Sequence, residues 1–490
     1  MRIFFFFSLT VFQALNADVL KVTVPYNGPI TKDEPIQNEM ILPPILGSLK
    51  TDSLKPIFGE TRDTEIFFND IPLNDPSAPR GMADLQYLKF GRALVREGGV
   101  FNLSSDEVPG RIALSNLGPD IRFSLPHQIS PFVALSSQSF QNSGARWRLN
   151  AGVKGTFSLD ETMVDFSLLK IKGENKYKEH GFLKTSTADQ NGASIKIVSS
   201  KCVFISLKHM DIQRNYGDIK ISGQTDMVEV GAFLTPHASV SFKVLEEKDQ
   251  DQNRTLPFFT WKNENLSLGM SFLEKEIYPE FSTYFGNKTL FFEAIAKKRP
   301  PKLSELTIDY ETTPKNWVKI KSDLTSETLF GARAGWTNGT FDIQGGTDFL
   351  ICPILYDYET YQNFNGPNWG KPFVKTGFRI EGAYFGYKYT SPNFITHPSQ
   401  MINVPVHHFN WTWDFNMDHM KIHASIDICP LIKRYDEETK SIVGNGYESR
   451  FGLQIDHKPF FIKLDIISAD PSQMNNDLFI FSAGVHIDAL

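Results

Sequence analysis

Alternation of apolar and polar residues with a period of two dominates the chain after residue 125. From Ala145 to Leu159 one set of alternate positions is apolar or small, and the other set is mostly Arg, Asn, Lys, Thr or Ser. Because successive side chains of a strand point to opposite faces, only a strand explains a run of this length. The alternation recurs at 409–417 and 479–487, and Asn338-Gly339 between two such runs is typical of a two-residue hairpin turn. The pattern predicts an all-β body at 126–490, with roughly 14–20 antiparallel strands.

Two architectures can hold such strands, and they imply different functions. In a transmembrane β-barrel the apolar face meets lipid and the polar face lines the lumen, whereas a multi-sheet β-sandwich buries the apolar face between sheets. The runs are nine or more residues long, which suits barrel strands of ~9–11 residues better than sandwich strands of ~5–6. Trp147 and Phe157 stand near the two ends of one run, where the aromatic girdles of a barrel lie. The chain ends in Asp488-Ala489-Leu490 without an aromatic residue, so we prefer the barrel and keep the sandwich as the alternative.

The segment from Asp18 to residue 125 differs in composition from the body. It is rich in proline and turn residues, and proline removes a hydrogen-bond donor from a strand ladder. We expect an irregular N-terminal segment that packs against or inside the rest. Its first residues, Asp18–Val24, resemble the TonB box of energised outer-membrane transporters, which adds a strand to its partner. A plain strand explains the same short pattern and is preferred.

The first 17 residues have the features of a secretory signal peptide. Arg2 precedes an apolar run at 3–12, and Ala17 supplies a small residue for cleavage. A run of ten residues is too short to cross ~30 Å of hydrocarbon as a helix, and no later stretch approaches ~18 apolar residues. We therefore expect an exported protein that is either soluble or spans a membrane as a barrel.

Composition excludes several classes of function. Lys and Arg number 50 against 56 Asp and Glu, a net charge of −6, so the chain has no basic excess for nucleic acid. Three cysteines exclude a disulfide-dense scaffold or a multi-cysteine metal site. No motif for a nucleophile, a phosphate loop, a dinucleotide or a zinc protease occurs. We expect no enzymatic activity and no cofactor.

The polar face of the strands supplies the candidate lumen residues. They carry both signs of charge, as a water-filled pore would, and they are Arg146, Arg148, Lys154, Arg333, Asp342, Asp348, Asp414 and Asp418. A denser group of His and Asp residues lies at 407–423. Its members at 408, 414 and 418 share one strand and would spread over roughly 30 Å, so we expect a solvated polar face and no metal site.

Cys352 and Cys429 occupy matching places in two similar segments, Ile351–Leu355 and Ile428–Ile432. Export permits a disulfide between them if the two segments are neighbours, with buried free thiols as the alternative. If the source is a eukaryote, six sequons become candidate glycan sites: Asn102, Asn253, Asn265, Asn287, Asn338 and Asn410.

The sequence favours an outer-membrane β-barrel that serves as a porin-like diffusion channel or as a structural protein. Its expected partners are membrane lipid, small solutes and, in an oligomer, further copies of itself. The alternative, from a different class, is a secreted all-β glycoprotein that binds a ligand or a protein partner.

Overall fold

The computed structural model describes six short stretches before residue 129 and most of the body after it. The described residues are 34–35, 65–74, 92–96, 100–104, 111–115, 119–122 and 129–486, with gaps in the last range at 141–143, 160, 180–181, 201, 217–218, 236, 251, 264, 288, 314–315, 358–361, 367, 392–403, 418, 437–440 and 470–476. The predicted signal peptide and the segment Asp18–Val24 lie outside them.

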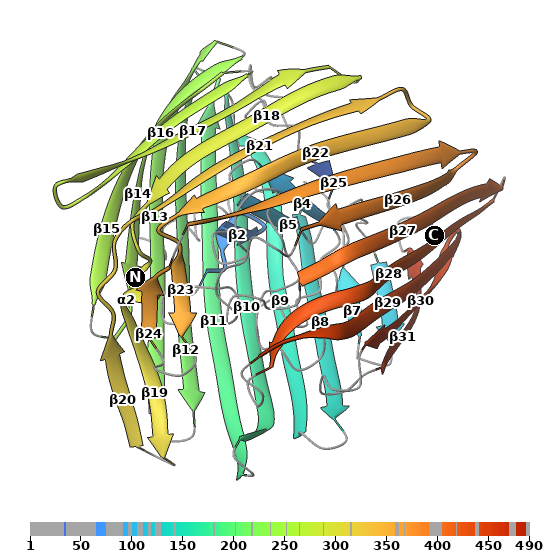
Figure 1. Ribbon diagram of the computed structural model, residues 1–490, viewed down its shortest axis with the longest axis horizontal. Coiled ribbons are helices and arrows are strands. Elements are labelled where there is room, and N and C mark those ends of the chain that lie inside the picture. Colours follow the sequence, from blue (N-terminus) through green and yellow to red (C-terminus); the bar gives the residue numbers. More distant parts are fainter. Residues whose placement is uncertain are drawn as a thin grey trace.

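Antiparallel strands form one closed barrel, which has 22 strands among the described residues (Figure 1). The ring closes where β31 pairs with β6, and every other neighbour in the ring follows in chain order. The barrel strands are β6 (Arg111–Ser115), β7 (Asp120–Arg122), β8 (Ile129–Phe140), β9 (Gly144–Leu159), β10 (Thr162–Glu179), β11 (Phe182–Ser199), β12 (Val203–Tyr216), β13 (Ile219–Thr235), β14 (Ala238–Lys248), β15 (Asn253–Lys262), β16 (Leu266–Leu273), β17 (Glu276–Gly286), β18 (Leu290–Arg299), β21 (Glu327–Thr337), β22 (Phe341–Ile351), β25 (Trp369–Ile380), β26 (Ala383–Thr390), β27 (Val404–Met417), β28 (Met420–Asp436), β29 (Ser441–His457), β30 (Phe460–Ala469) and β31 (Asp477–His486).

Five short strands of the N-terminal segment form a second sheet. In sheet order they are β1 (Glu34–Pro35), β4 (Arg92–Arg96), β5 (Val100–Ser104), β2 (Glu65–Phe68) and β3 (Ile71–Pro72). Strands β2, β4 and β5 are drawn within the outline of the barrel in Figure 1, and β3 contacts the barrel strands β10, β11 and β12. We call this sheet the plug.

The two ends of the barrel differ in their connections. At one end, the turn end, strands are joined by hairpins such as those at 338–340 and 381–382. At the other, the long-loop end, three connections of 13 to 27 residues occur at 300–326, 352–368 and 391–403. The first holds α2 (Leu303–Leu306), β19 (Thr307–Thr313) and β20 (Asn316–Lys321), and the second holds β23 (Ile354–Asp357) and β24 (Gln362–Asn365).

A belt of exposed apolar side chains surrounds the barrel. On β13, for example, Val228 and Val230 point outward and are each 45% exposed, whereas Met227 points inward and is buried. Toward the long-loop end the outward face becomes polar, because His209 pairs with Asp226 and Lys170 pairs with Asp189 beyond the apolar positions. An exposed apolar belt that runs around a barrel is typical of a surface that faces lipid. The longer strands therefore extend past the belt at the long-loop end only.

Phenylalanine rings lie over glycines of the neighbouring strand along the wall. Phe204 is directly opposite Gly231, and Phe461 is directly opposite Gly484. A Cβ atom at these glycines would overlap the ring, so the glycine makes room for it. The same arrangement joins Phe132 to Gly152, Phe166 to Gly155, Phe291 to Gly335, Phe373 to Gly346 and Phe349 to Gly370. These pairs account for seven of the 41 phenylalanines in the chain.

The predicted all-β barrel is confirmed, and the closed sheet replaces the sandwich alternative. The described ring has 22 strands, somewhat more than the 14–20 expected, and it starts at β6, before residue 126. The hairpin at Asn338-Gly339 is present, but its loop has three residues and only Gly339 has a positive φ of 90°. Within the described residues, no helix is long and apolar enough to cross a membrane.

Candidate functional site: the plugged lumen

The plug meets the barrel wall through the hairpin of β2 and β3. Its two turn residues, Asn69 and Asp70, have φ values of 49° and 66°, which a type I′ turn requires and which Asn and Asp tolerate. The flanking apolar residues Phe68 and Ile71 have no exposed surface, and Leu73 is 2% exposed. A short hairpin with so many buried apolar side chains must be docked on another surface.

That surface is the inner wall formed by β8 and β10–β12. The ring of Phe68 packs edge-on against Phe132 of β8, with ring centroids 5.5 Å apart. Ile71 fills the space over Gly192 of β11, where a Cβ atom would overlap its Cγ2 atom. The hydroxyl of Ser194 donates a hydrogen bond of 3.3 Å to the backbone oxygen of Asn69. The hairpin is thus fitted to this wall by shape and by a buried hydrogen bond.

Three inward lysines lie on β11, β12 and β14, and one of them, Lys208, contacts the hairpin. Lys208 of β12 places its ammonium 4.4 Å from the ring centroid of Phe67 and 4.0 Å from a carboxylate oxygen of Asp70. Lys196 lies over Phe204 at 5.7 Å, and Lys243 lies over Phe258 at 4.4 Å. An ammonium over an aromatic face is attracted by the ring quadrupole. We call Lys196, Lys208 and Lys243 the basic patch.

On the wall formed by β17–β25, several inward charges are paired within the barrel. Arg333 and Glu293 are both buried and form an ion pair of 2.5 Å between β21 and β18. Lys371 lies 3.6 Å from the buried Asp348, and Lys297 lies 3.7 Å from Glu280. Buried charges require such partners. These three pairs are formed between barrel residues and do not involve the plug.

A buried ionic cluster at the long-loop end fixes two of the long connections. Arg299 at the end of β18 pairs with Glu305 of α2 at 2.8 Å and with Glu327 of β21 at 3.2 Å. Glu327 also accepts a hydrogen bond of 2.7 Å from the backbone N–H of Ile354. The side chain of Asn365 joins the two connections again, because its amide bonds to Thr325 in both directions. We call Arg299, Glu305 and Glu327 the rim clamp.

The candidate lumen residues take different places. Arg148, Arg333 and Asp348 are buried on the inward face, while Lys154 and Asp342 are inward and half-buried. Asp414 is inward and exposed near the turn end. Arg146 lies on β9, and Asp418 falls outside the described residues. They do not form one cluster but are distributed around the wall.

The group of His and Asp residues at 407–423 divides over both faces of the sheet. On the outward face, the hydroxyl of Tyr387 and the Nδ1 atom of His407 are joined by a hydrogen bond of 2.9 Å. On the inward face, His408 lies 3.5 Å from Asp427, and His423 lies 2.7 Å from Asp414. The described residues contain no group of three potential ligands that could hold a metal ion.

The candidate disulfide between Cys352 and Cys429 is absent, and all three cysteines are free. Cys352 directly follows β22, whereas Cys429 lies on β28, and β25, β26 and β27 separate them. Four strand spacings of ~4.8 Å amount to roughly 19 Å along the sheet, far beyond the ~5.5 Å that a disulfide needs.

The sequons occupy unequal surroundings. Asn265, Asn287 and Asn338 lie at hairpins of the turn end, and the side chains of Asn287 and Asn338 accept backbone hydrogen bonds there. Asn253 begins β15, Asn102 lies on β5, and Asn410 donates an inward hydrogen bond of 2.5 Å to Asp427. Glycosylation at these positions stays a prediction.

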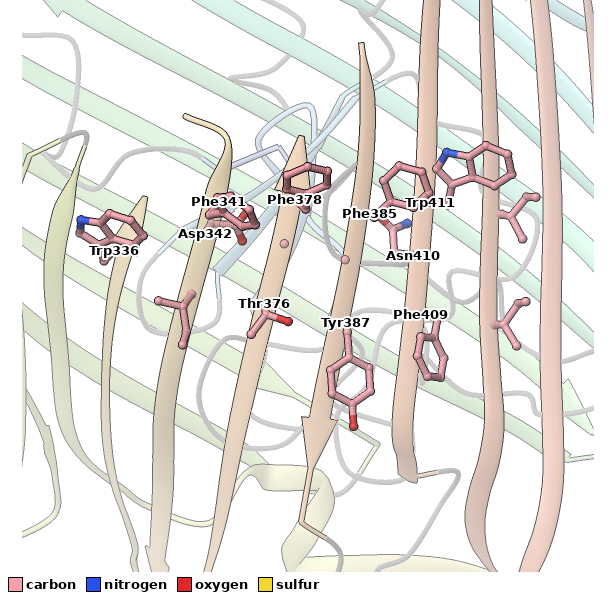
Figure 2. A pocket seen from close by; sticks show the side chains of 15 residues that line it. Trp336, Phe341, Asp342, Thr376, Phe378, Phe385, Tyr387, Phe409, Asn410 and Trp411 are labelled. Atoms are coloured by element: carbon pink, nitrogen blue, oxygen red, sulfur yellow. The ribbon is translucent and has the colours of Figure 1, made fainter. Parts of the chain in front are cut away.

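A hollow of about 800 Å³ on the outer surface is lined by aromatic side chains. Phe341, Phe378, Phe385 and Trp411 occupy directly opposed positions on β22, β25, β26 and β27. Figure 2 shows these rings in one row, with the short Thr376 in the adjoining space. The hollow belongs to the lipid-facing belt and lies outside the lumen.

The plug hairpin and the basic patch were not predicted from the sequence. The segment Phe67-Phe68-Asn69-Asp70-Ile71 carries a hairpin signal, two turn-forming residues between apolar ones, within the proline-rich region. The lysines occupy alternate positions on their strands, but only the three-dimensional structure shows that they lie close together and that Lys208 contacts the hairpin.

No protein-family model matches the chain, and no curated protein sequence is similar to it. Its fold, however, is similar to solved structures. A mutant of the ferric enterobactin receptor PfeA from Pseudomonas aeruginosa has a TM-score of 0.62 at 10% identity, covering 87% of this chain and 91% of that one. The siderophore receptor PirA from Acinetobacter baumannii gives 0.61 at 10% identity with the same coverage. The FrpB iron transporter from Neisseria meningitidis gives 0.58 at 9%, covering 87% and 92%.

Proposed function

We propose that the protein is an exported outer-membrane transporter that imports a small solute through a lumen controlled by the plug. The observation that carries this proposal is the β2–β3 hairpin docked on the inner wall of a 22-stranded barrel. Barrels of 16–18 strands leave an aqueous channel, whereas 22-stranded outer-membrane transporters have a plugged lumen. The similarity to siderophore receptors and an iron transporter supports transport and an outer-membrane location, and it offers no support for enzymatic activity.

A porin-like diffusion channel is the alternative function, and the plug argues against it. Free diffusion needs an open cross-section, but the hairpin fills part of this lumen with buried apolar side chains. The belt of exposed apolar residues argues against the other alternative, a secreted binding protein, because a soluble protein rarely exposes so large an apolar surface. A plugged transporter needs an external source of energy to move the plug. In this proposal the segment Asp18–Val24, which resembles a TonB box, is the attachment point for such a partner.

Conductance of the full chain in planar lipid bilayers tests the proposal. We expect the unmodified protein to show little conductance, because the hairpin is docked. The variant Ile71→Asn places a polar amide in a fully buried contact, so the hairpin should undock and conductance should rise. A matched control, Lys275→Asn, changes an exposed residue in the hairpin turn between β16 and β17 and should leave conductance low.

Two outcomes would contradict the proposal. Stable, porin-like conductance of the unmodified chain would show that the lumen is open and would favour passive diffusion. Equal conductance of the unmodified chain and Ile71→Asn would show that the hairpin does not control passage.

A further inference from the structure

We infer that the basic patch is a binding site for a small multivalent anion on the import path, and that Asp70 of the plug occupies this site at rest. The inference rests on the proposed function, because it assumes that the plug leaves the wall during import. It adds the charge class of the solute and the place where the solute binds.

The three lysines converge on one area of the inner wall. Lys208 of β12 is directly opposite Ser194 of β11, and Lys196 is two residues further along the same strand. Glu229 of β13 is directly opposite Lys243 of β14 and opposite Ser206 of β12. All three ammonium groups therefore lie around Glu229, the acidic residue that the wall itself supplies there. Three cations against one carboxylate leave this area positive when the plug is away.

Asp70 is the second acid near these lysines, and it belongs to the plug. Its carboxylate lies 4.0 Å from the ammonium of Lys208, and its side chain is 55% exposed to the lumen. The inward cations Arg333 and Lys371, by contrast, have carboxylate partners on the barrel, Glu293 and Asp348. Movement of the plug removes the partner of Lys208 but leaves those pairs intact. Because Asp70 moves with the plug, its carboxylate occupies the site beside Lys208 only while the plug is docked. A bound anion could take the same position after the plug has left.

Aromatic faces complete the site and limit the chemistry of the ligand. Phe204 and Phe258 lie beneath Lys196 and Lys243, and the ring of Phe67 lies against Lys208 only while the plug is docked. Withdrawal of the plug exposes Lys208 and an apolar area beside it. A solute with two or more carboxylate or similar anionic groups suits the charges, and a planar apolar part suits the rings.

Binding of citrate to the detergent-solubilised full chain tests the inference by titration calorimetry. The variant Asp70→Asn removes the built-in anion and keeps the size of the side chain. We expect it to bind citrate at least about tenfold more tightly than the unmodified protein, since one competing charge-assisted contact is lost. Asp323→Asn changes an exposed aspartate in the connection 300–326 and should have no effect.

Two further variants, each combined with Asp70→Asn, locate the bound citrate. Lys208→Gln should abolish the gain in affinity, whereas Lys375→Gln, which removes an inward lysine of β25 outside the patch, should preserve it. An unchanged affinity of Asp70→Asn, or an equal loss with either lysine variant, would overturn the inference. Citrate binding could follow these expectations although the unmodified protein conducts ions freely. That result would support the anion site and contradict the proposed control of the lumen by the plug. The two conclusions therefore fail separately.

Discussion

The substitution Gly192→Ala should undock the plug hairpin from the wall without disturbing the barrel. Gly192 lies on β11 beneath Ile71, and a Cβ atom at this position would overlap the Cγ2 atom of that fully buried side chain. The same overlap does not arise at Gly269, an inward glycine of β16 whose nearest neighbour would be the Cβ atom of Glu280 at 3.4 Å, an ordinary contact. Gly269→Ala is therefore a matched control for the effect of the extra methyl group on the unfolded chain.

The expected size of the effect follows from the packing. Overpacking a tight site by one methyl group costs about 1–3 kcal/mol. The cost falls mainly on the docked state, because the tightest contact is with Ile71 of the hairpin, which can leave, and the nearest barrel atom is the flexible Cε atom of Met210 at 3.3 Å. A change of this size multiplies the undocked population by about 5- to 150-fold.

Hydrogen–deuterium exchange of residues 65–73 measures that population. In Gly192→Ala we expect faster exchange in the hairpin by about the same factor, with unchanged exchange in β21 and β22. Ile71→Ala removes the overlapping atom, so the double variant should exchange more slowly than the product of the single effects predicts. Unaltered hairpin exchange in Gly192→Ala would refute the docking described here.

Three further outcomes follow from the wall and the belt. Val230→Arg places a charge in the lipid-facing belt and should destabilise the protein in bilayers by ~2–4 kcal/mol, while Gln224→Arg, outward on the same strand but beyond the belt, should cost ~0–1 kcal/mol; equal effects in unfolding titrations would contradict the face assignment. Arg333→Met leaves Glu293 buried without its partner and should cost about 3–5 kcal/mol, whereas replacing both residues by Met should cost much less, as a double-mutant cycle would show. Mass mapping of the unreduced, denatured protein should find all three cysteines alkylated, and a linked pair of cysteine peptides would contradict the free thiols.

The sequence predicts the barrel wall well because membrane strands repeat a simple physical rule. The alternation at 145–159 assigns Trp147 to lipid and Arg148 to the interior, and the structure places them so. The short strands β6 and β7 were not predicted because three to five residues carry too little periodicity to be distinguished from loop. Their assignment depends on pairing. Strand β6 pairs with β31, which is distant in the chain, and β7 pairs with the longer strand β8.

The candidate site was predicted only in part, for a different physical reason. Period-two alternation predicts which side of a strand faces the lumen, as for Asp348, but it contains no information about what else lies in the lumen. Lys208 differs from Lys371 only in its partner, and that partner is 138 residues earlier in the chain, on the plug. Likewise, the similarity of the segments around Cys352 and Cys429 indicates like positions in two hairpin groups, but positions repeated around a barrel are separated by the strands between them.

The rim clamp makes the entrance to the barrel unequal around its circumference. By holding the connections at 300–326 and 352–368 together through buried charges, it prevents either from swinging aside as a separate flap. Between β8 and β17 the connections at the same end have only two to four residues, so that sector of the rim is formed by the strands themselves and carries no long connection. In the proposed transporter, a solute would enter past the sector without long connections, beside the wall that carries the basic patch. The arrangement of the connections at the rim and the positive charge of the inner wall would then favour the same side of the lumen.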